Sequence, residues 1–418
     1  MRSILKVSAL SATATATLVL VAGCGGTAEP GADHNPKKPS ASAPPRQSYD
    51  PPQRFATQGA PLPEAAGHGS ITRAGTVAKP LPLALHGTSA YIATADHLQV
   101  LDTGTGAPTA TVRPRHKPLA APDAEASAPV VTQDNKLVLA AFLVEFPGKG
   151  TTPSRAGVEL DAIDTTTNKT AWTVDLPASG VQREAQVRVV AATKTTAVIS
   201  AISGRGATYA VDLGTRRATW HNDDAGAAAV IGDTAVAITS KDGVRQQVIG
   251  LDINHDGKQT WTKLDGYEMT AHTAGPHLIA ITGRDYNSGD TIGTLLKPDG
   301  SKAADLTGEL FGLTCQYDDA SITICQTDEP RTLALDAETG KQLWTLPEQG
   351  ANRVAPTVTA AWHGVVYGTT SNGPVALDAK TGADRSTPGV APSAVNEYTG
   401  VALNQTDHQT LIAHPATG

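Results

Sequence analysis

Short apolar runs alternate with polar turns from about Leu83 to the end of the chain. A typical run is Gly364–Gly368 (GVVYG), and Gly, Asp, Asn and Thr fill the segments between such runs. Short apolar runs bounded by turn residues are typical of β-strands. Beyond the N-terminal segment, no stretch has the period of an amphipathic helix. The pattern predicts an all-β fold.

One turn sequence recurs along the chain. Its complete form is Ala334–Trp344 (ALDAETGKQLW), in which Asp336 can accept bonds from later amides and Gly340 supplies a positive φ. Lys297 and His414 take the Asp place in two degenerate copies. The Asp recurs at Asp102, Asp164, Asp212, Asp252 and Asp378. A turn repeated at intervals indicates an array of similar units.

The tryptophans follow the same repeat. Trp172, Trp220 and Trp344 stand eight residues after the motif Asp, and Trp261 stands nine after its own. Four of the five tryptophans therefore share one repeat position. A large side chain placed periodically is expected to pack between neighbouring units.

The repeat divides the chain into eight units, each of four strands and roughly 40 residues. Their ranges are 83–117, 128–177, 187–223, 227–265, 269–306, 311–349, 355–389 and 392–418. Such units are typical of β-propeller blades, so we predict an eight-bladed propeller of four-stranded antiparallel blades, with seven blades as the alternative. The last unit stops before its fourth strand. We expect the N-terminal strand Ile71–Ala78 to fill that place and close the ring.

The repeat supports a family resemblance. Ala334, Asp336, Thr339, Gly340 and Trp344 form a pattern that resembles the tryptophan-docking repeat of quinoprotein-like (PQQ-like) β-propellers. That family includes PQQ-dependent alcohol dehydrogenases and a non-enzymatic outer-membrane assembly lipoprotein, BamB. The resemblance implies an eight-bladed propeller and leaves the activity open.

The N-terminal region is predicted to be a targeting segment and a tether. Residues 1–24 combine Arg2 and Lys6 with an apolar stretch and end in Val21–Cys24 (VAGC), which resembles the bacterial lipobox. The resemblance implies that Cys24 is lipidated and anchors the protein on the extracytoplasmic face of the cell membrane. The alternative is a plain secretory signal. Residues 25–70 are rich in Pro, Gly and Ala and are expected to be a disordered tether before a propeller at 71–418.

The other two cysteines flank a predicted turn. Antiparallel pairing around residue 320 sets Cys315 opposite Cys325, where a disulfide can form in an exported protein. Two free thiols or a metal pair are the alternatives.

Asp252, Asn254 and Asp256 place oxygens at alternate positions before Gly257, as calcium loops do. However, Lys263 stands where an EF-hand has its bidentate Glu, and turn chemistry explains most of the pattern. Calcium binding is therefore one interpretation of these residues, and an ordinary turn is the other.

Composition and motifs restrict the classes of function that we expect for this chain. A net charge of −7 and the lack of a basic patch argue against a nucleic-acid partner. The chain lacks the adjacent cysteines that the resemblance associates with PQQ, and it has no Cys-x-x-Cys-His or His-Glu-x-x-His motif. We expect a monomeric, non-catalytic binding or scaffold module without PQQ, which recognises an envelope protein or a cell-wall ligand. A quinoprotein-type surface oxidoreductase and a carbohydrate-binding module are the alternatives.

The lipidation hypothesis gives the first testable prediction. Because the acyl chains on Cys24 would hold the protein in the membrane, Cys24→Ser should release it from the membrane fraction or leave it unprocessed. Cell fractionation and intact-mass measurement check this. Unchanged fractionation and mass would contradict the assignment.

Overall fold

The computed structural model describes residues 46–62, 81–119, 126–177, 181–202, 206–240, 244–308, 310, 312–328, 331–348, 350, 352–404 and 410–418. Within these ranges the regular secondary structure is entirely β, as predicted. No helix in these ranges is long and apolar enough to cross a membrane. Cys24 and Ile71–Ala78 lie outside the described residues.

In most of the antiparallel sheets the strands lie side by side in the order in which they occur in the chain. We call each such sheet a blade, and we divide the one seven-stranded sheet into two blades. Blade 1 contains β2 (Leu83–His86), β3 (Ser89–Ala93), β4 (Leu98–Asp102) and β5 (Pro108–Val112). Blade 2 contains β6 (Lys117–Pro118), β7 (Val130–Val131), β8 (Leu137–Phe146), β9 (Arg155–Asp164) and β10 (Lys169–Pro177). Blade 3 contains β11 (Gln186–Ala192), β12 (Thr196–Ile202), β13 (Ala207–Asp212) and β14 (Arg217–Asn222).

Blades 4 and 5 share one seven-stranded sheet. It runs through β15 (Ala225–Ile231), β16 (Thr234–Ser240), β17 (Gln246–Asp252), β18 (Gln259–Thr273), β19 (Ile279–Asp285), β20 (Thr291–Leu296) and β21 (Lys302–Asp305). The 15-residue strand β18 ends blade 4 and begins blade 5. Gly266 lies at the changeover, since it pairs with both Gln246 and Asp285.

The remaining strands make three further sheets. Blade 6 contains β22 (Thr314–Tyr317), β23 (Ile322–Gln326), β24 (Thr332–Asp336) and β25 (Gln342–Leu346). Blade 7 contains β26 (Thr357–Trp362), β27 (Val365–Thr370), β28 (Gly373–Asp378) and β29 (Asp384–Ser386). Blade 8 contains β30 (Ala394–Val395), β31 (Thr399–Leu403), β32 (Leu411–Pro415) and, from the N-terminal side, β1 (Ala60–Leu62).

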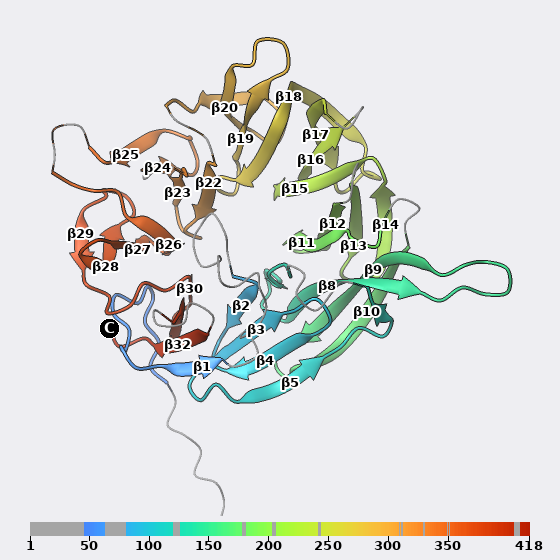
Figure 1. The fold of residues 1–418 in the computed structure, drawn as a ribbon, viewed down its shortest axis with the longest axis horizontal. Helices are drawn as coiled ribbons and strands as arrows, with labels where there is room; N and C mark the ends of the chain where they lie inside the picture. Colours follow the sequence, from blue (N-terminus) through green and yellow to red (C-terminus); the bar gives the residue numbers. More distant parts are fainter. Residues whose placement is uncertain are drawn as a thin grey trace, which may run out of the picture. The chain divides into compact units, whose positions relative to one another are not determined.

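The blades form a ring around an axis (Figure 1). Contacts between first strands make a closed cycle that runs β2, β7, β11, β15, β18, β22, β26, β30 and back to β2. Apolar clusters fill the spaces between neighbouring blades, such as the cluster that joins Leu139 and Leu160 to Ile199 and Tyr209. The propeller prediction is confirmed, and the cycle is consistent with eight blades.

The repeated Asp side chains hold the connections between third and fourth strands. Oδ1 of Asp336 accepts bonds from the backbone N–H and the hydroxyl of Thr339 at 2.8 and 2.7 Å. Gly340 closes the turn with a φ of 72°, which costs a residue without a Cβ little. Arg216 occupies the Gly position of blade 3 and still has a φ of 60°. The tertiary structure imposes this left-handed backbone on a residue that does not favour it.

Three tryptophans bridge neighbouring blades. The indole N–H groups of Trp220, Trp261 and Trp344 donate to the carbonyl oxygens of Ile253, Pro298 and Ala379 at 3.0, 2.8 and 2.8 Å. Each acceptor belongs to the turn of the next blade. Each ring lies on the Gly of that same turn: a Cβ on Gly257, Gly300 or Gly382 would approach the indole to 2.5, 2.7 or 2.9 Å. The glycines of the repeat therefore have two roles: they allow the positive φ of the turn, and they leave room for the tryptophan ring of the preceding blade.

The structure differs from two of our expectations about the N-terminal region, namely which residues complete the last blade and where the tether ends. The strand that completes blade 8 is β1, in which Ala60 pairs with Ala413 and Leu62 with Leu411, at the place that we assigned to Ile71–Ala78. Residues 46–62, which we assigned to the tether of 25–70, pack on the ring. Because this segment has few apolar residues, its sequence resembles a tether and does not indicate that it packs on the ring. A few anchors such as Phe55 and Leu62, which are 4% and 0% exposed, combine with backbone bonds to hold it.

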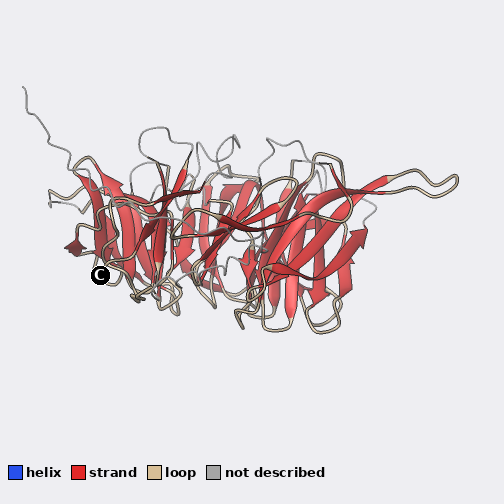
Figure 2. Cartoon of the chain, turned by 90° about the horizontal axis from the view of Figure 1, so that it is seen from below, coloured by secondary structure: helices blue, strands red, loops and turns tan. Residues whose placement is uncertain are grey.

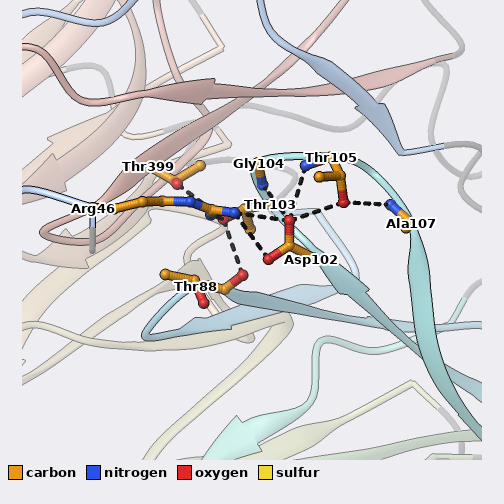
Figure 3. A network of polar contacts seen from close by, with 8 residues as sticks. All are labelled: Arg46, Thr88, Asp102, Thr103, Gly104, Thr105, Ala107 and Thr399. Carbon is orange, nitrogen blue, oxygen red and sulfur yellow. Dashed lines mark hydrogen bonds and ion pairs between the residues drawn. The ribbon is translucent and has the colours of Figure 1, made fainter. Parts of the chain in front are cut away.

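We call residues 46–62 the strap, because they bind three consecutive blades. At blade 1, Arg46 donates to both carboxylate oxygens of Asp102 at 2.8 and 2.9 Å and to the hydroxyl of Thr103 at 2.8 Å (Figure 3). At blade 7, the ring of Phe55 packs edge-on against Tyr367, with 5.7 Å between centroids. At blade 8, the N–H groups of Gln53 and Ala56 donate to the carbonyl oxygens of Gly418 and Pro415.

The docked rings give a prediction that separates backbone strain from ring contact. Gly382 and Gly364 both have positive φ, but only at Gly382 would a Cβ meet a ring, that of Trp344. Gly364→Ala should cost about 1 kcal/mol of unfolding free energy, and Gly382→Ala about 1–3 kcal/mol more because the site becomes overpacked. Denaturant unfolding measures both variants.

The excess cost should vanish when Trp344→Ala is also present, because the ring that the Cβ meets is then gone. Equal costs for Gly382→Ala with and without Trp344 would contradict the docking account.

Candidate functional site

The ring has two ends, and loops join the strands at both of them (Figure 2). Because neighbouring strands are antiparallel, the connections from first to second and from third to fourth strands lie at one end. The connections from second to third strands lie at the other end. We call them the turn end and the opposite end. The repeat Asp turns all belong to the turn end, where they shape the ring.

A cavity of about 500 Å³ opens along the axis at the turn end. First strands of five blades line it, through residues such as Leu85, Val131, Gln316, Trp362 and Val395. Residues of the adjoining connections, Gly87, Asn135 and Glu397 among them, form its rim. A concave pocket with a few convergent polar groups is the usual place for a ligand.

The charged groups of this cavity are mainly acidic. Asp319 and Glu397 contribute carboxylates, and His86 contributes an imidazole. Asp319 is exposed to solvent, yet many protein atoms surround its carboxylate within the cavity. This partial desolvation raises the pKa of Asp319, the nearby His363 opposes the rise, and the Asp318 charge adds to it. A cationic group would compensate both carboxylates.

The turn that carries Asp319 is held from both sides. Oδ1 of the fully buried Asp318 accepts bonds from the N–H groups of Ala320, Ser321 and Ile322, and its Oδ2 accepts one from Gly364 in blade 7. Asp319 itself has a φ of 58°. The bonds to Asp318 link blades 6 and 7 and fix the direction of the neighbouring carboxylate.

The rim also contacts the strap. The Trp362 ring stacks on His363 at 4.0 Å between centroids, and Nδ1 of His363 pairs with the carboxylate of Asp50 in the strap. The backbone N–H of Tyr49 donates to the carbonyl of Glu397 at 2.7 Å. The segment that closes the ring therefore also positions two sides of the cavity.

The predicted disulfide is present. Cys315 in β22 lies directly opposite Cys325 in β23, and their sulfurs are bonded. The next residue, Gln316, lines the axial cavity and accepts a bond from the N–H of Ala361 in blade 7 at 3.2 Å. The disulfide thus joins the first two strands of blade 6 beside the cavity.

The calcium candidates lie in the connection between β17 and β18. One carboxylate oxygen of Asp252 accepts a bond from the N–H of Asn254, and the other lies 2.9 Å from Nδ1 of His255. Asn254 and Asp256 are exposed. The turn is formed by the protein's own groups, and calcium binding there stays a prediction.

A second polar group lies between blades 1 and 2. Glu159 is completely buried and accepts bonds from the N–H groups of Arg115 and His116 at 2.6 and 3.0 Å. His116, Glu159 and Asp175 bring potential metal-binding atoms within 4.8 Å of one another. The Arg115 guanidinium already pairs with Asp175 at 2.8 Å. Burial raises the pKa of the neighbouring Asp161 to about 7, with Glu159 adding to the rise.

Sequence reasoning did not single out the cavity residues. Asp319, Trp362 and Glu397 belong to no motif, and only the ring brings the three together. They share only their position, because each lies at the end of a first strand or two residues beyond it.

Comparisons with known proteins agree with this fold. A family model described as outer membrane protein assembly factor BamB matches residues 304–413. No curated protein matches the chain. The computationally designed Ika8 protein is 16% identical, with 88% of this chain and 99% of that chain covered and a TM-score of 0.51.

Two natural proteins are more distant in structure. BamB from Moraxella catarrhalis is 16% identical over 69% of this chain and 79% of its own, with a TM-score of 0.39. Quinohemoprotein alcohol dehydrogenase from Comamonas testosteroni is 12% identical over 82% and 76%, with a TM-score of 0.48. At these distances neither likeness supports an inference about activity. The family match, the cycle of blades and the ring-on-turn docking together identify the chain as having the fold of the PQQ-like β-propellers.

Proposed function

We propose that this protein is a lipid-anchored, extracytoplasmic binding module whose ligand enters the axial cavity at the turn end. The ligand we infer is a basic segment of an envelope protein. The observation that carries the proposal is the pair of carboxylates, Asp319 and Glu397, in a cavity of about 500 Å³. A Lys or Arg side chain entering there would compensate charges that the lining itself leaves in excess.

The cavity is suited to recognition by a preformed site. Its rim is fixed by the Asp318 turn, the Cys315–Cys325 bond and the strap contacts at Asp50. A site held in place before binding loses little conformational entropy when the ligand enters. The membrane anchor follows from Cys24 and remains part of the proposal.

The quinoprotein alternative fits these residues less well. PQQ carries several carboxylates, and Asp319 and Glu397 would repel an anionic cofactor. Cys315 and Cys325 belong to two neighbouring strands, so they do not form the adjacent pair that the resemblance associates with the cofactor. We therefore propose a non-catalytic role.

A carbohydrate ligand is the second candidate, and Trp362 in the cavity lining favours it. Aromatic faces pack against the apolar faces of sugars, and polar rim residues such as Asn135 would bind hydroxyls. Binding of a neutral sugar would not depend on the two carboxylates, which separates this candidate from the first.

The test uses a fluorescent lysine-rich hexapeptide as the probe. Asp319→Asn combined with Glu397→Gln should weaken binding about tenfold or more, because two ion pairs with the peptide are lost. Fluorescence anisotropy measures the change, and added salt should weaken binding to the unaltered protein.

The matched control is Asp305→Asn with Glu338→Gln, which removes the same two residue types from sites whose side chains are 62% and 74% exposed. Its affinity should be unchanged. Equal loss in both double variants, or binding that ignores salt, would contradict the proposed role of the cavity.

A further inference from the structure

A second cavity, of about 320 Å³, lies at the opposite end of the ring. The first strands of blades 3, 4 and 5 line it through Arg188, Ala228 and His272. Ile202 and Ser240, where β12 and β16 end, complete its wall beside the connections between second and third strands. It shares no lining residue with the axial cavity at the turn end.

Arg188 is the unusual residue in this wall. Its Nη2 donates to the carbonyl oxygens of Ala227 and Ala228 at 3.1 and 3.2 Å. Its Nε is buried and donates to no group among the described residues. Across the described ranges no Asp or Glu forms an ion pair with this guanidinium.

A purely structural role explains only part of this arrangement. The two carbonyl oxygens lie at an irregularity of β15, where the pairing with β16 shifts between Ala227 and Ala229. Arg188 satisfies these carbonyls and ties blade 3 to blade 4. That role accounts for the two hydrogen bonds that Nη2 donates. Within the described residues it leaves a partly buried positive charge without a counter-ion and a buried Nε–H without an acceptor, and both are costly.

The surroundings respond to that charge. Burial lowers the pKa of Arg188, although a guanidinium stays protonated at any physiological pH. Burial and, second to it, the Arg188 charge lower the pKa of His272. His272 is therefore held neutral and can offer one ring N–H to an anion.

We propose that this cavity binds an organic oxyanion, a carboxylate or phosphate on a small apolar group, with the Nε–H of Arg188 as its principal donor. The guanidinium supplies the compensating charge and a directed hydrogen bond. Ser240 and the neutral His272 stand in the same wall as further polar groups. An oxyanion there would supply the counter-ion that no described residue provides.

The apolar part of the ligand is inferred from the remaining wall. Ile202, Ile238 and Met269 line the cavity together with Arg188. Ile202 is 42% exposed, which is unusual for a large apolar side chain in this protein. A short alkyl or side-chain group attached to the anion would cover it and gain affinity from the area removed from water.

Calorimetric titration with hexanoate and with hexyl phosphate tests the site, and acetate, inorganic phosphate and hexan-1-ol serve as comparators. We expect saturable binding of a six-carbon anion, tighter than its small counterpart by roughly fourfold for each methylene group buried. Hexan-1-ol, which lacks the charge, should bind at least about tenfold more weakly. The tighter of the two six-carbon anions identifies the ligand as a carboxylate, such as a peptide terminus, or as a phosphate, such as a lipid headgroup.

Arg188→Gln should weaken binding of that anion about tenfold or more, because the charge is lost while an amide N–H remains. Arg217→Gln is the matched control, since Arg217 is exposed on the outer strand of the same blade. Equal affinity in Arg188→Gln and the unaltered protein would overturn the proposal, as would the absence of saturable binding by either anion.

A spectroscopic readout keeps the proposal testable if Arg188→Gln fails to fold. In the unaltered protein, the ¹⁵Nε resonance of Arg188, assigned with the milder Arg188→Lys variant, should shift on titration with the six-carbon anion. The resonances of exposed arginines such as Arg217 should not shift. A stationary Arg188 resonance at saturating anion would also overturn the proposal.

Discussion

Ring closure is the constraint on which the rest of this structure depends. Seven blades complete their sheets with their own residues, whereas blade 8 has only β30, β31 and β32 from its own part of the chain. Without a fourth strand, the backbone groups along the outer side of β32 would lack partners, and a ring with such an edge invites opening or pairing between molecules. β1 supplies the missing strand, and the rest of the strap holds it in place through Arg46 on blade 1 and Phe55 on blade 7. Closure therefore depends on a segment far from blade 8 in the sequence.

Local chemistry explains why so much of the ring could be predicted. The Asp, Thr and Gly of each turn act over three or four residues, and their bonds form wherever the sequence repeats. The docking of Trp344 on the next turn extends the same regularity to the neighbouring blade. The disulfide could be predicted for the same reason, because the register of one hairpin places Cys315 opposite Cys325.

The other features could not be read from local pattern, because they depend on residues that only the closed ring brings together. The backbone carbonyl of Pro61, in the strap, lies against Gly106 in the turn of blade 1, which is the place that a tryptophan ring occupies in blades 4, 5 and 7. The strap therefore takes the place of the repeat's tryptophan without sharing its sequence. Asp319 and Glu397 line one cavity although they come from blades 6 and 8 and belong to no shared motif. The surroundings of Arg188, which among the described residues include no counter-ion, are set by neighbours in blades 4 and 5 that its own sequence context does not indicate. The turn-end cavity is thus a consequence of closure and contacts the strap, whereas the cavity at Arg188 depends on the packing of three consecutive blades.

The most direct test of closure compares the melting of three chains that begin at residues 25, 46 and 63. The first two differ only by residues that precede the strap, and they should melt within about 2 °C of each other. The third lacks β1 together with Phe55 and Leu62, two buried anchors worth roughly 2–5 kcal/mol each, and it loses the pairing of β32 as well. Its melting temperature should fall by roughly 10 °C or more, or the chain should fail to remain soluble. If the chain that begins at residue 63 melted like the other two, the strap would not be what closes the ring.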